Sequence, residues 1–168
     1  LQLNTVEVKK TADLATGFLW LLNDYAMYPA PGGSIGAGYD LRNLILNLRG
    51  NLFGNSEVIF LSGSMECYFP IQKKKSTPFI GGGMGLSRTF VKTEVPQRDF
   101  YGNVYGTTQE FESAGGLMLT AGGGYIFNRN SNVSFRLSGN FVAGLYNDEV
   151  LTKSTQALMF KMEILFGK

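Results

Sequence analysis

The charged side chains inside apolar stretches are the residues of this sequence that could do acid–base chemistry. Lys161 and Glu163 lie two residues apart in the last apolar stretch, and Arg136 lies in the stretch before it. A carboxyl group beside cations can serve proton transfer, but the same grouping also forms structural ion pairs where charges share one face of a sheet. We interpret these three residues as structural ion pairs.

The residue types needed for most catalytic sites are missing or scarce. The sequence has no histidine, and its one cysteine is Cys67. Ser-His-acid hydrolysis, histidine proton shuttling and histidine-ligated metals all require a histidine, and one cysteine cannot build a zinc site. We therefore expect no catalytic residues, no metal site and no cofactor.

A glycine-rich run, GGGMG at residues 81–85, could be taken for a phosphate-binding loop. No Lys-Ser/Thr pair follows it and no helical pattern begins there, so we reject that interpretation. The flanking residues instead alternate: Ile80, Met84 and Leu86 share one parity, and the other parity holds almost only glycine. This alternation predicts a strand with one apolar face and one nearly empty face.

The composition favours a single β domain. The chain has 168 residues, with 22 Gly, 13 Phe and 8 Tyr, and only 17% of its residues are charged. Glycine is therefore about twice as frequent as in an average protein. A net charge of +2 gives no basis for nucleic-acid binding, which needs a concentrated basic face. The one basic run, Lys73–Lys75, is interpreted as a solvated turn.

Alternation of apolar and small or polar residues recurs along most of the chain. It predicts seven strands, at 33–41, 44–53, 58–70, 78–91, 111–127, 133–146 and 156–166. The N-terminal part allows two interpretations. Residues 13–23 could form an eighth strand with Phe18, Trp20 and Leu22 on one face, or an amphipathic helix capped by Asp13. Small single-chain membrane barrels have an even number of strands, which favours the strand.

The non-apolar parity of these strands suits the inside of a narrow barrel better than a water-facing surface. It consists of Gly, Ser, Asn and Thr with few charges, so we expect the apolar parity to face lipid and the small residues to face inward. The charges of the inward parity are balanced and predict an internal ion-pair network of Asp40, Arg49, Glu66, Arg136, Lys161 and Glu163. The alternative is that these charges are scattered over the solvent-facing side of a soluble sheet.

The connections between the expected strands alternate in length. Short connections interleave with others at 23–32, 54–57, 92–110 and 147–154, two of them long, as in outer-membrane barrels. Aromatic residues near the strand ends, Tyr68 and Phe79 among them, are expected to form the girdles at the two bilayer interfaces. The loop 92–110 is the best candidate for a recognition surface. Its residues of interest are Arg98, Phe100, Tyr101 and Tyr105.

Four segments carry a resemblance to a known group of proteins. They are SIGAGYDL at 34–41, PFIGGGMGLS at 78–87, LMLTAGGGYIF at 117–127 and LMFKMEILF at 158–166. The chain resembles the small eight-stranded outer-membrane barrels of Gram-negative bacteria, the OmpA-like, OmpX-like and opacity-type proteins. The resemblance implies an all-β, eight-stranded antiparallel up-and-down transmembrane β-barrel in the bacterial outer membrane, mature after removal of a signal peptide.

The resemblance also gives the last strand a role in biogenesis. Its alternating apolar residues look like the signal that the barrel assembly machinery reads: Leu158, Phe160, Met162, Ile164 and Phe166. In this chain Gly167 and Lys168 follow Phe166, so the aromatic residue is not terminal.

We expect one domain over residues 1–168, with a periplasmic segment at 1–12 and the barrel at 13–168. The expected function is non-enzymatic: a structural or surface-interaction role through extracellular loops, or an accessory subunit of a larger envelope complex. The expected partners are outer-membrane lipids, lipopolysaccharide, the barrel assembly machinery and other envelope proteins, but not nucleic acid. Two alternatives stay open, a soluble lipocalin-like barrel that carries an apolar ligand and a narrow ion channel.

Overall fold

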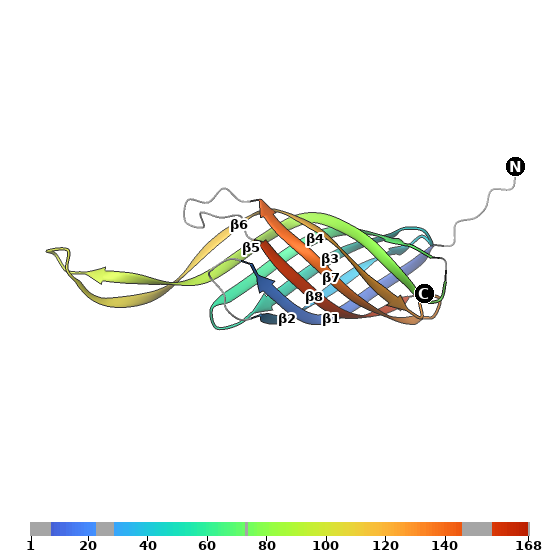
Figure 1. Ribbon diagram of the computed structural model, residues 1–168, viewed down its shortest axis with the longest axis horizontal. Coiled ribbons are helices and arrows are strands. Elements are labelled where there is room, and N and C mark those ends of the chain that lie inside the picture. Colours follow the sequence, from blue (N-terminus) through green and yellow to red (C-terminus); the bar gives the residue numbers. More distant parts are fainter. Residues whose placement is uncertain (1–7, 23–28, 73, 146–155, 168) are drawn as a thin grey trace, which may run out of the picture.

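Eight strands close into one antiparallel barrel (Figure 1). The computed structural model describes residues 8–22, 29–72, 74–145 and 156–167. Each strand pairs with the next along the chain, and β1 pairs with β8 to close the ring. The strands are β1 (Lys9–Leu21), β2 (Ala30–Asp40), β3 (Ile45–Gly54), β4 (Val58–Pro70), β5 (Thr77–Arg98), β6 (Val104–Phe127), β7 (Val133–Leu145) and β8 (Gln156–Gly167).

The eight-stranded antiparallel barrel expected from the sequence is confirmed, and the N-terminal segment is a strand rather than a helix. β1 begins earlier than expected, at Lys9, inside the stretch assigned to a periplasmic segment. Its first residues pair with the end of β2, Lys9 opposite Asp40 and Thr11 opposite Gly38. The described residues contain no helix that is long and apolar enough to cross a membrane.

The expected loop at 92–110 is mostly strand, and this part of the prediction is wrong. β5 continues through Arg98 and β6 begins at Val104, so the two strands form a hairpin that projects beyond the barrel along its long axis (Figure 1). The segment looked like a loop because it is polar on both faces and packs on no core. Its threonines, valines and tyrosine nevertheless favour extended backbone, and the two strands satisfy each other's hydrogen bonds.

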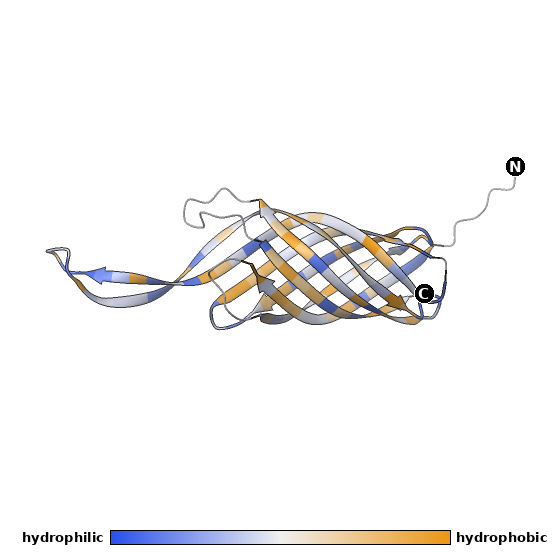
Figure 2. Ribbon diagram, in the orientation of Figure 1, coloured by the Kyte–Doolittle hydropathy of each residue, from blue (hydrophilic) through white to orange (hydrophobic). Residues whose placement is uncertain are grey.

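Apolar and polar residues alternate along the strands of the barrel (Figure 2), and the exposed side chains show that the apolar parity faces outward. Ile35 and Leu86, for example, are each 68% exposed, whereas Ser34 and Ser87 next to them are buried inside. A soluble carrier would have the reverse arrangement, with apolar residues inside and polar residues outside. The outward apolar belt therefore argues against the lipocalin-like alternative and matches a lipid-facing wall.

The barrel interior has three layers. An apolar cluster fills the end nearest the hairpin, with Phe53, Phe60 and Met118 among its members. A smaller cluster fills the end with the short turns and consists of Ile45, Tyr68, Phe79 and Ile126. Tyr68 and Phe79 therefore lie inside rather than in the expected outer girdle, with ring centroids 5.1 Å apart. Between the two clusters lies a layer of charged and polar side chains.

Candidate functional site

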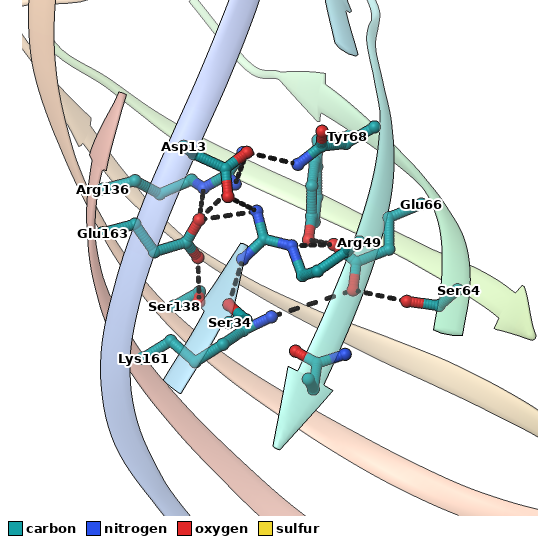
Figure 3. A network of polar contacts seen from close by, with 12 residues as sticks. Asp13, Ser34, Arg49, Ser64, Glu66, Tyr68, Arg136, Ser138, Lys161 and Glu163 are labelled. Atoms are coloured by element: carbon teal, nitrogen blue, oxygen red, sulfur yellow. Dashed lines mark hydrogen bonds and ion pairs between the residues drawn. The ribbon is translucent and has the colours of Figure 1, made fainter. Parts of the chain in front are cut away.

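Six charged side chains form an ion-pair layer across the middle of the barrel (Figure 3). Its members come from five strands and carry three negative and three positive charges: Asp13, Arg49, Glu66, Arg136, Lys161 and Glu163. All six are buried. Because each strand contributes at most two of them, the layer depends on closure of the barrel.

Arg49 is the centre of this ion-pair layer. Its Nη2 lies 2.9 Å from Asp13 Oδ1 and 2.7 Å from Glu163 Oε2, and its Nε lies 3.0 Å from Glu66 Oε2. The guanidinium thus bridges carboxylates of β1, β4 and β8. Arginine suits this position because its planar fork can meet several carboxylates at once.

Arg136 makes the second group of contacts. Its Nε donates to Glu163 Oε2 at 2.9 Å, and its Nη2 bonds to the same oxygen. Its guanidinium also lies over the ring of Tyr68, 4.7 Å from the centroid. Arg136 therefore joins the ion-pair layer to the aromatic cluster at the short-turn end.

Neutral side chains complete the coordination of the carboxylates. Asn47 donates to Asp13 Oδ2 at 2.7 Å, Ser138 donates to Glu163 Oε1 at 3.0 Å, and the Tyr68 hydroxyl donates to Glu66. The amine of Lys161 lies 3.7 Å from Glu66 Oε1. Buried charges are stable only when such partners replace the water they have lost, so the layer is built as a structural unit.

The structure brings five of the six expected network residues together and places one elsewhere. Arg49, Glu66, Arg136, Lys161 and Glu163 form the layer. Asp40 does not reach it, because it lies at the last residue of β2. Its carboxylate accepts from Arg129 Nε at 2.8 Å and so ties the β2 end to the β6–β7 turn.

Asp13 is the member that sequence reasoning missed. The sequence offered it as a helix cap because the N-terminal segment had two interpretations. A signal was present, since Asp13 has the inward parity if Phe18 and Trp20 face outward. Gly36 lies directly opposite Asp13 and makes room for it: a Cβ at Gly36 would be 2.7 Å from Asp13 Oδ2.

The ion-pair layer is closed on both sides by the apolar clusters, which leaves it poorly suited to conduction or catalysis. An ion would have to pass Phe53 and Phe60 at one end and Tyr68 and Phe79 at the other, all fully buried. The carboxylates are engaged by guanidinium groups and amides. Among the described residues, no group of His, Cys, Asp and Glu is arranged to hold a metal ion.

The projecting hairpin is the other candidate site. At its tip Phe100 is 99% exposed and Tyr101 is 87% exposed, and their rings meet edge to face with centroids 5.9 Å apart. Tyr105 is 68% exposed on the returning strand. Arg98 lies beside the tip, where its guanidinium donates to Gly102 O at 3.4 Å. The expected recognition residues thus gather at one end of the molecule.

Asp99 organises the turn at this tip. Its carboxylate accepts from the backbone N–H groups of Tyr101, at 2.9 Å, and Asn103, at 2.8 Å. Gly102 has a φ of 85°, the left-handed conformation that glycine adopts at little cost. The hydrogen bonds from the backbone and side chain of Asn103 lower the pKa of Asp99 below its ordinary value.

The expected assembly signal forms the outward face of β8. Phe160, Met162, Ile164 and Phe166 are exposed to the surroundings of the barrel, and Leu158 is half-buried on the same face. The pattern therefore lies on the outer surface of the barrel along the closing strand. Its role in assembly stays a prediction.

No protein-family model matches the sequence, and no curated protein matches it either. The structure is similar to that of Neisserial surface protein A, at 16% identity over 95% of this chain and 96% of that one, with a TM-score of 0.63.

Two further structures are similar. One is the N-terminal β-barrel domain of Pseudomonas aeruginosa OprF, at 15% identity over 95% of this chain and 100% of that one, with a TM-score of 0.54. The other is Ail, the attachment invasion locus protein of Yersinia pestis, at 12% identity over 96% and 97% and a TM-score of 0.57. The fold is that of a small eight-stranded outer-membrane barrel. At these identities the similarity shows the fold alone.

Proposed function

We propose that the protein is a non-enzymatic integral barrel of the bacterial outer membrane that makes contacts through its projecting hairpin. The apolar outward belt supports placement in lipid, because such a surface would be costly in water. The absence of histidine from the sequence and the engagement of the buried carboxylates support a non-enzymatic role. In this proposal, membrane lipids and lipopolysaccharide surround the protein, and the barrel assembly machinery inserts it into the membrane.

The observation that carries the contact role is the hairpin itself. A strand pair that leaves the barrel and ends in exposed aromatic rings has no structural purpose inside the barrel. None of the residues 94–109 belongs to either interior cluster. Aromatic side chains are the residues that most often anchor protein interfaces, since they bury much surface at a small cost in side-chain entropy.

Among the described residues, the hairpin also has a strand edge that pairs with no other strand. In the described residues, β6 pairs with β7 only from Leu117 onward, so residues 104–116 have no neighbour on that side. The opposite edge, on β5, carries Lys92 and Pro96, which discourage strand addition. The β6 edge at 104–109 holds no charged residue and no proline, which favours pairing with an extended segment of a partner, such as another envelope protein.

In-cell photo-crosslinking tests the contact role. A photo-reactive phenylalanine analogue at Phe100 is expected to give discrete protein adducts in living cells. The same analogue at Ile35, on the lipid-facing belt, serves as the matched control and is expected to give none. Absence of any protein adduct from Phe100, or equal adducts from both positions, would contradict the proposal.

A further inference from the structure

The end of the barrel opposite the hairpin carries a ring of exposed cations, which we call the basic rim. It consists of Lys10, Arg42, Lys74 and Lys75, all exposed. Lys10 lies at the start of β1, Arg42 in the β2–β3 turn, and the two other lysines in the β4–β5 turn. The cations are thus distributed around the rim rather than gathered in one patch.

Acidic residues do not neutralise the basic rim. Asp40 is the one carboxylate at this end among the described residues, and it is paired with Arg129. The amine of Lys9 is also engaged, by the backbone carbonyls of Arg129 and Ser131. None of the four rim cations forms an ion pair within the described part of the chain, so their charges are available to an external anion.

The hairpin end has the opposite balance. Its described acids are Glu57, Glu94, Asp99, Glu110 and Glu112, and its described cations are Arg88, Lys92 and Arg98. The separation of charge therefore follows the barrel axis, with positive charge at the short-turn end and an excess of negative charge at the other. General solubility gives no reason for charges to be sorted in this way.

The depth of the basic rim matches lipid headgroups. Lys10 pairs across the strands with Tyr39, and both side chains face outward. Exposed Tyr39 and Phe69 lie where the apolar belt ends, the position of aromatic girdles at a bilayer interface. Lys74 and Lys75 lie in the β4–β5 turn, past the end of β4 at Pro70 and before β5 begins at Thr77. They are therefore farther from the apolar belt than Phe69, on the side where lipid headgroups adjoin an aromatic girdle.

We propose that the basic rim binds the phosphate groups of anionic phospholipids in the leaflet at the short-turn end. The amines and the Arg42 guanidinium donate to phosphate oxygens, and the aromatic girdle sets their depth. Cations spread over the start of β1 and two separate turns fit lipids that surround the barrel better than they fit one acidic protein, which would meet a single patch. The inference uses the membrane placement proposed above but not the contact role of the hairpin.

Lipid retention tests this proposal. The full chain is folded into vesicles of equal parts phosphatidylglycerol and phosphatidylcholine and extracted in mild detergent, and the retained lipids are counted by native mass spectrometry. The wild-type protein is expected to retain phosphatidylglycerol preferentially. In K74Q/K75Q the preference should fall by about fivefold per lysine. The control K92Q/R98Q removes the same charge from the hairpin end and should keep the preference.

The outcomes separate the explanations. Equal retention of both lipids by the wild-type protein overturns the proposal. Binding of an acidic protein would then be the remaining explanation for the exposed cations of the basic rim. Equal loss in both double variants overturns it too, because overall charge would then explain the preference. Heat-modifiable migration on a denaturing gel shows that each variant is folded. Failure of the hairpin crosslinking experiment would leave these results unaffected, so the two proposals fail separately.

Discussion

Arg49 and Arg98 show what the same side chain does in the two distinct regions of this molecule. Arg49 is buried in the ion-pair layer and meets carboxylates from three strands. Arg98 lies on the projecting hairpin, where its contact is the backbone carbonyl of Gly102. The interior uses its charges to hold the barrel together, whereas the hairpin exposes its polar and aromatic groups to the surroundings. We therefore propose that different parts of one continuous sheet carry the stability of the barrel and its contacts with partners.

The largest effect is expected from filling the inner wall of the barrel. A Cβ at Gly83 would lie 2.4 Å from the backbone oxygen of Met65, so Gly83→Leu must separate β5 from β4. We expect this variant to lose the heat-modifiable folded form. Met84→Leu changes the neighbouring lipid-facing residue and should fold like the wild type. Normal folding of Gly83→Leu would show that the close strand approach is not required.

Removing the centre of the ion-pair layer should have the next largest effect. Arg49→Ala leaves buried carboxylates unpaired and should lower the free energy of unfolding by about 3–5 kcal/mol. Arg98→Ala, the matched change on the hairpin, should alter it by less than about 0.5 kcal/mol. Urea unfolding in vesicles, followed by the fluorescence of Trp20, the one tryptophan, measures both. Equal effects of the two variants would mean that the layer is not structural.

Shortening the hairpin should have little effect on the barrel. Residues 94–109 can be replaced by Asn-Gly, because Thr93 and Glu110 face each other and a two-residue turn can join them. The urea midpoint and heat-modifiable migration should stay close to those of the wild type. A barrel that loses cooperative unfolding after this change would contradict the division between the two regions.

The smallest expected effect concerns the tip of the hairpin at low pH. The pKa of Asp99 is lowered, so the stabilisation from its hydrogen bonds is present above the ordinary carboxyl pKa of about 3.9 and is lost as the pH falls through the lowered value. The NMR signals of the Tyr101 and Asn103 amides should shift there while barrel amides do not. In Asp99→Asn this transition should be absent. An unchanged transition in that variant would assign it to another group.

Sequence reasoning succeeded where a repeating pattern was imposed by closure of the barrel. Alternation gave the strands and their faces, because a one-residue shift would turn every apolar side chain inward. It therefore also placed Arg49, Glu66 and Glu163 on the inner wall. The pattern could not say how far along the axis each residue lies, since that depends on strand register. For this reason Asp40 was wrongly expected in the network, whereas Asp13 was missed because residues 13–23 could also form a helix.

Two other features were predicted wrongly, for different reasons. Tyr68 and Phe79 have the inward parity, but aromatic residues near strand ends usually belong to the outer girdle, and this general tendency prevailed. The strands of the hairpin were missed because no core imposes alternation on residues that extend past the barrel. In the hairpin, the pairing of β5 with β6 rather than an alternating pattern decided the structure.

The central claim is that a lipid-embedded barrel presents the hairpin at the cell surface and the basic rim on the periplasmic side of the outer membrane. Cysteine labelling on intact cells tests this claim most directly. Cys67 faces the lipid side and is first replaced by serine. Phe100→Cys and Lys75→Cys are then introduced separately and exposed to a membrane-impermeant maleimide. We predict that Phe100→Cys is labelled on intact cells and that Lys75→Cys is labelled only after the outer membrane is permeabilised. Labelling of Lys75→Cys but not Phe100→Cys on intact cells, or recovery of the protein in the soluble fraction, would contradict the account.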